Sequence, residues 1–138
     1  MHECKGKFRT RGTVAVVVTV SEERFEQMIA DALDEIPTEL ARAIENVAVV
    51  VEEWPTREQE ARAGDTLLGL YEGIPITRRG PISYGGVAPD HITVFRGPLS
   101  MLARDDTDLA QRVRITVLHE VGHYFGMSDD RLREMGWA

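Results

Sequence analysis

The clearest hydrophobic pattern in the chain runs from about Asp108 to Phe125. Apolar side chains recur there at steps of three and four residues, which is the period of one face of an α-helix. The apolar positions are Ala110, Val113, Val117, Val121 and Tyr124. Residues 105–108 read DDTD, which suits the N-cap and the positive end of a helix dipole, and Gly126 is a typical helix stop. We therefore predict a helix over 108–125 with its apolar stripe facing the core.

A second helical pattern follows Ser21, a residue type that favours the N-cap position, and ends before Pro37. Its apolar positions are Phe25, Met28, Ile29, Ala32, Leu33 and Ile36. We expect a short helix over 38–45 to follow it, and another short helix at the C-terminus. The two long patterns predict that a pair of helices covers one sheet.

β-Branched and alternating apolar runs predict strands between these helices. The predicted strands span 13–20, 47–53, 67–71, 76–78 and 91–96. Polar residues predict a surface loop over 56–65, and glycines and prolines predict a turn over 73–75 and an exposed loop over 80–90. Residues 1–12 are basic and are expected to form a flexible tail, since no small-residue cleavage site for export follows. The pattern as a whole predicts one α+β domain over 1–138, with a small mixed sheet packed against two helices.

Composition narrows the choice of partners and compartment. The 138 residues are 43% hydrophobic and 28% charged, as in ordinary globular proteins, and carry a net charge of −7. The negative charge argues against nucleic acid or an anionic membrane as partner. Cys4 is the only cysteine, which excludes an internal disulfide and favours a reducing, cytoplasmic location. No apolar run reaches the 18 or more residues that a membrane span needs.

The end of the predicted long helix carries the strongest chemical signal, the sequence HEVGH over 119–123. His119 and His123 are four residues apart, so both imidazoles project from one helix face with Cβ atoms about 5–6 Å apart. This separation suits one zinc ion, whose bonds to imidazole nitrogen are about 2.0–2.1 Å long. Glu120 can act as the base that takes a proton from an activated water. The motif predicts metal-assisted hydrolysis.

A catalytic zinc usually takes a third protein ligand, and the chain offers one just after the helix. Gly126 can reverse the chain direction, and Asp129 lies six residues beyond His123. The full pattern, HExxHxxGxxD, differs from the metzincin pattern HExxHxxGxxH only in its last ligand. Asp130 and Glu134 are alternative third ligands.

On these residues the chain resembles a small bacterial family of zincin-like, minimal metzincin-type metallopeptidases. The similarity extends over about Val20 to Glu134, and its most specific part is the block 119–130. The supporting segments are 24–25, 32–37, 67–73 and 75–77. The resemblance implies a zincin-like fold, one zinc ion per chain held by His119, His123 and Asp129, and Glu120 as catalytic base.

The predicted function is a zinc metallopeptidase acting on a peptide or protein. Only nine residues follow Asp129, too few for the lower subdomain of full metzincins, so we expect a shallow cleft or one completed by a partner or a second copy. Two other functions stay open. One is a metal-dependent ribonuclease, since one such family has a similar His-x-x-x-His-x-x-Gly helix but lacks the glutamate. The other is a non-catalytic, metal-stabilised binding module.

Overall fold

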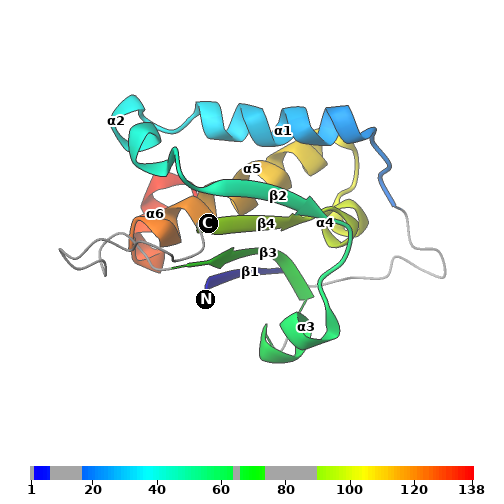
Figure 1. Cartoon of the computed structure of the whole chain (residues 1–138). Helices are drawn as coiled ribbons and strands as arrows, with labels where there is room; N and C mark the ends of the chain where they lie inside the picture. The colour runs from blue at the N-terminus through cyan, green and yellow to red at the C-terminus, as the bar shows by residue number, and fades with distance from the viewer. Residues whose placement is uncertain (1, 7–16, 64–65, 74–89) are drawn as a thin grey trace.

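A four-stranded mixed sheet lies at the centre of the computed structural model, which describes residues 2–6, 17–63, 66–73 and 90–138 (Figure 1). The strand order is β1-β3-β4-β2. The strands are β1 (His2–Gly6), β2 (Ala48–Glu52), β3 (Thr66–Glu72) and β4 (His91–Phe95). β2 is parallel to β4, whereas β3 is antiparallel to both β1 and β4. The mixed sheet predicted from the hydrophobic pattern is confirmed.

Helices α1 and α5 pack against each other, and α5 also packs against β1, β3 and β4 (Figure 1). The helices are α1 (Glu22–Asp34), α2 (Thr38–Ala41), the 3-10 turn η1 (Arg42–Ile44), α3 (Arg57–Ala63), α4 (Arg96–Leu102), α5 (Asp106–Tyr124) and α6 (Asp129–Met135). The main core lies between the sheet and the α1–α5 pair. The α+β class with a small mixed sheet and two packed helices is therefore as predicted.

Local capping explains where the two long helices begin. The Ser21 side chain accepts a hydrogen bond from the Arg24 amide at 3.1 Å, and the Asp105 side chain accepts one from the Asp108 amide at 2.7 Å. Each cap satisfies an amide that the first helical turn leaves without a backbone partner. Both helices then bury most of the predicted stripe, with Phe25 1% exposed and Val113 0% exposed, while Leu33 and Ala110 are partly buried.

Two ion pairs join α1 to α5 beside this core. Arg24 Nη2 lies 2.8 Å from Asp106 Oδ1, at the start of both helices. Arg114 Nε lies 2.7 Å from Glu35 Oε2, where α1 ends. The two pairs thus flank the apolar contact between α1 and α5 near both ends of α1.

Several predictions about the shorter segments were wrong. His2–Gly6 form strand β1 rather than part of a flexible tail, because β3 offers them a free edge to pair with. The predicted loop 56–65 contains helix α3, which starts where Thr56 and Gln59 hydrogen-bond reciprocally as in a capping box. The predicted strand 91–96 is confirmed as β4, which ends at Phe95, but the helix α4 that follows without a break was not predicted. Pro98 is tolerated in α4 because it lies in the first turn.

The outcome of four other predictions lies partly or wholly outside the described residues. Residues 17–20 of the predicted strand 13–20 are not in a strand, although Val18 donates one hydrogen bond to the Ser100 carbonyl at 3.1 Å. The predicted turn and strand between 74 and 78, and residues 80–89, are not among the described residues. Asp90, at the end of the predicted exposed loop, is buried and accepts a hydrogen bond from the Tyr71 hydroxyl at 2.6 Å. No described helix is long and apolar enough to cross a membrane.

Candidate metal centre

Helix α5 ends as the sequence predicts, in a turn built around Gly126. This glycine has φ +73°, the left-handed conformation that side chains disfavour. Its amide donates to the His123 carbonyl at 3.0 Å, and the Met127 amide donates to the Gly122 carbonyl at 3.0 Å. These two bonds form a Schellman motif, which closes the helix and reverses the chain. Ser128 then caps α6, so Asp129 is the first residue of the returning helix.

Gly122 lets α6 pack directly on α5. A Cβ atom at this position would lie 2.1 Å from Leu132 Cδ2, much closer than van der Waals contact allows. Leu132 itself is completely buried. Gly122 therefore permits the close approach of α6 to α5.

The turn and the helix contact bring three potential metal ligands together. One donor atom each of His119, His123 and Asp129 lies within 4.8 Å of the other two. The two histidines face each other through their Nε2 atoms, 2.9 Å apart. With zinc–nitrogen bonds of about 2.0–2.1 Å, two imidazole nitrogens on one tetrahedral zinc ion lie about 3.3 Å apart. The observed distance between the two Nε2 atoms is only a few tenths of an ångström shorter than this value. Two imidazoles and one carboxylate fit zinc.

The alternative third ligands have other partners. Asp130 pairs with Arg133, and Glu134 Oε2 lies 3.3 Å from Arg131 Nη1. Both ion pairs lie within α6, so neither carboxylate belongs to the converging group. The geometry therefore favours Asp129.

The surroundings of His119 favour its neutral form. The ring is half-buried, and this burial lowers the pKa of His119, an effect that the Trp137 carbonyl and the charge of Asp129 partly oppose. A metal binds only the neutral imidazole, because protonation removes the nitrogen lone pair. The local electrostatics thus favour the form of His119 that is able to bind a metal.

Glu120 lies between α5 and β3 and is completely buried. A Cβ atom at Gly69 of β3 would lie 3.5 Å from Glu120 Cγ and 2.6 Å from Thr116 Cγ2. Gly69 is therefore required for this part of α5 to approach the sheet. The sequence analysis did not single out Gly69, although a glycine inside a strand pattern is a known sign of close approach.

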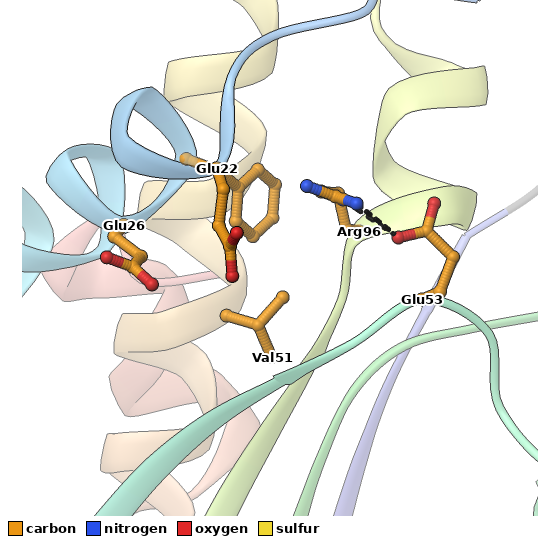
Figure 2. Close-up of a pocket in the computed structure, with 6 residues that line it drawn as sticks. Glu22, Glu26, Val51, Glu53 and Arg96 are labelled. Carbon is orange, nitrogen blue, oxygen red and sulfur yellow. Dashed lines mark hydrogen bonds and ion pairs between the residues drawn. The ribbon is translucent and has the colours of Figure 1, made fainter.

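A second cluster of ionisable side chains lies in a pocket of about 150 Å³ between α1, β2 and α4 (Figure 2). It contains Glu22, Glu26, Glu53 and Arg96, with Phe25 and Val51 as apolar lining. Arg96 Nη2 lies 2.7 Å from Glu53 Oε2. No sequence pattern predicts this pocket, because its residues come from α1, from β2 and the segment just after it, and from α4.

Comparison with known proteins agrees with the geometry. The family model for zincin-like metallopeptidases matches residues 44–137, which is more than half of the chain. The chain therefore belongs to the zincin-like metallopeptidase family, whose members are expected to hold zinc. No curated protein is significantly similar in sequence.

Among solved structures, a conserved hypothetical protein from T. thermophilus is similar to this chain. The two are 25% identical, and the TM-score is 0.51. The match covers 84% of this chain and 97% of the other. The resemblance thus extends over nearly the whole of the T. thermophilus protein.

Proposed function

We propose that this protein is a zinc-dependent metallopeptidase that binds one zinc ion through His119, His123 and Asp129. The observation that carries the proposal is the convergence of these three donors, in the order of the zincin motif, on a chain of the zincin-like family. Zinc, when bound, would polarise the scissile carbonyl and make a water molecule more acidic.

The protein's own residues would bind the ion and transfer the proton. His119 and His123 would hold the ion from one face of α5, while Asp129 would supply a negative charge from α6. Glu120 would take the proton from the attacking water and pass it to the leaving nitrogen. Because Glu120 is buried, the proton it accepts would be shielded from exchange with bulk water.

The substrate we propose is a peptide or a protein, in the cytoplasm, rather than a nucleic acid or a membrane component. Net charge of −7 supports the exclusion of nucleic acid, and the single cysteine supports a reducing compartment. The exposure of Asp129 supports an open, shallow site, which a partner or second copy would complete.

The test separates metal binding from catalysis. Glu120→Gln keeps the side-chain shape but removes the base, so zinc content should stay stoichiometric while peptide hydrolysis falls by about 10²–10⁴-fold. Glu134→Gln is the matched control, since Glu134 is exposed on α6 and lies outside the donor group. Zinc content by mass spectrometry and cleavage of a peptide library, with RNA as a parallel substrate, are the measurements.

Each outcome has a clear meaning. A Glu120→Gln variant that cleaves peptides at the parental rate would exclude Glu120 as base. A zinc-loaded parent that cleaves RNA but no peptide would point to the ribonuclease alternative. A zinc-loaded parent that cleaves neither would leave the metal-stabilised binding module.

A further inference from the structure

The C-terminal turn after α6 lies directly against the first histidine of the donor group. α6 ends at Gly136, which has φ +75°. The Gly136 amide donates to the Arg133 carbonyl at 3.1 Å, and the Trp137 amide donates to the Leu132 carbonyl at 2.8 Å. These bonds form a second Schellman motif, which directs Trp137 back towards α5.

The turn is held in place from two sides. The Trp137 side chain is 5% exposed and belongs to the main core. Arg114 of α5 donates from Nη1 to the Gly136 carbonyl at 3.4 Å, while its Nε is paired with Glu35 of α1. Three elements, α1, α5 and α6, thus determine where the Trp137 carbonyl lies.

That carbonyl oxygen is 3.2 Å from His119 Nδ1. A carbonyl can only accept a hydrogen bond, so Nδ1 must carry the hydrogen. The neutral ring then has its lone pair on Nε2, the nitrogen that lies 2.9 Å from His123 Nε2 inside the donor group. In metal sites a ligating histidine commonly donates its other ring N–H to such an acceptor, which fixes the tautomer and the ring orientation.

We infer that the Gly136–Trp137 turn positions the metal ligand His119, with the Trp137 carbonyl holding the ring as the Nδ1–H tautomer and directing Nε2 to the ion. The inference rests on the proposed metal centre and extends it to residues outside the HExxHxxGxxD motif. Loss of such an outer partner typically weakens metal binding by about 10–100-fold.

Gly136 offers a way to move the carbonyl without touching the donor group. A Cβ atom at this position would meet no atom within 4 Å, so the cost of a substitution comes from the positive φ alone. Gly136→Val is strained there because valine is β-branched, whereas Gly136→Asn is the matched control because asparagine tolerates the left-handed conformation. Gly136→Ala is a milder form of the same strain, which keeps the test usable if the valine variant does not fold.

Two measurements on folded protein test the inference. The first is zinc affinity, by competition with a chromophoric chelator, where we expect about 10–100-fold weakening in Gly136→Val and little change in Gly136→Asn. The second is the tautomer of His119 in metal-free protein, read from long-range ¹H–¹⁵N NMR of the imidazoles. We expect Nδ1–H in the parent and in Gly136→Asn, and a tautomer mixture in Gly136→Val. A turn with a merely structural role would lower the stability of the valine variant and leave both readouts unchanged in its folded fraction.

Two results would overturn the inference. One is a parent protein whose His119 carries its hydrogen on Nε2. The other is a folded Gly136→Val or Gly136→Ala variant with parental zinc affinity and parental tautomer. A parent that binds no zinc would contradict the proposed function instead, and the tautomer measurement would still decide whether the turn positions His119.

Discussion

Helix α6, which begins with Asp129, lies at one end of the sheet, and the starts of α1 and α4, which line the pocket of Figure 2, lie at the other end (Figure 1). The candidate metal centre and this pocket balance their charges differently. At the end formed by α5 and α6, two half-buried imidazoles face one exposed carboxylate. At the end where α1 and α4 begin, three carboxylates and one guanidinium line the pocket, and the guanidinium pairs with Glu53. With neutral histidines, the pocket carries the larger negative charge, yet the metal centre has the better ligands for zinc.

The difference shows that donor type and convergence identify a transition-metal site better than net charge. In the pocket, Arg96 forms an ion pair with Glu53. No three of the described carboxylates there lie close enough together to bind one metal ion. In the metal centre, a helical repeat and a Schellman turn place two nitrogens and an oxygen within reach of one ion. Imidazole nitrogen suits zinc, whereas carboxylates alone favour magnesium or calcium.

The largest expected effect is the loss of zinc when a histidine ligand is removed. His119→Ala leaves two ligands, so we expect zinc affinity to fall by more than about 100-fold. This is more than the affinity typically lost when a hydrogen-bond partner of a ligand, and not the ligand itself, is removed. Glu26→Gln, which removes a charge from the pocket, should leave zinc affinity unchanged. Competition titration measures both, and a loss in Glu26→Gln with none in His119→Ala would mean that overall charge rather than ligation holds the ion.

A somewhat smaller effect is expected at the third ligand. Asp129→Ala should weaken zinc binding strongly but less than His119→Ala does, because the ion keeps two imidazoles and loses only its anionic oxygen. Asp130→Ala is the matched control, since Asp130 is the next residue and pairs with Arg133. If the Asp130 variant lost zinc and the Asp129 variant did not, the third ligand would have been misassigned.

The pH at which zinc is released should reflect the buried histidine. An ordinary imidazole takes up a proton near about pH 6.5. Since burial lowers the pKa of His119, this ring stays neutral as the pH falls through that value, and zinc should be retained until the pH is lower still. Asp129→His should steepen the release, because one more imidazole must be protonated. Dialysis across a pH series with zinc analysis measures this, and release beginning above about pH 6.5 would contradict the predicted direction.

The smallest effect is expected in the pocket. Glu53→Gln breaks the ion pair with Arg96, whose partly exposed partners are screened by water, so the free energy of unfolding should change by less than about 1 kcal/mol. Zinc affinity should not change. Chemical denaturation of the metal-free protein measures the difference, and a loss of several kcal/mol would show that the pocket, and not only the helix pair, stabilises the fold.

The sequence alone predicts the bounds of helix α5 and the face on which its two histidines lie. The predicted helix over 108–125 is α5, Asp106–Tyr124, because a stripe of apolar side chains at helical spacing can be buried in only one way. The same repeat places His119 and His123 on one face. Gly126 ends the helix because it adopts a positive φ, a backbone conformation that glycine takes without strain and other residues do not. These features depend on residues less than two helical turns apart.

Other features appear only in the folded chain. Helix α3 depends on the Thr56–Gln59 capping box, and strand β1 depends on the free edge of β3. Helix α4 follows β4 directly and holds Pro98 in its first turn. The burial of Glu120 depends on Gly69, and the orientation of His119 depends on the Trp137 carbonyl, 18 residues further along. Local spacing determines which side chains share a helix face, because the helix repeat is constant. Contacts between elements depend on packing of the whole core, so only the tertiary structure decided which backbone group lies behind His119.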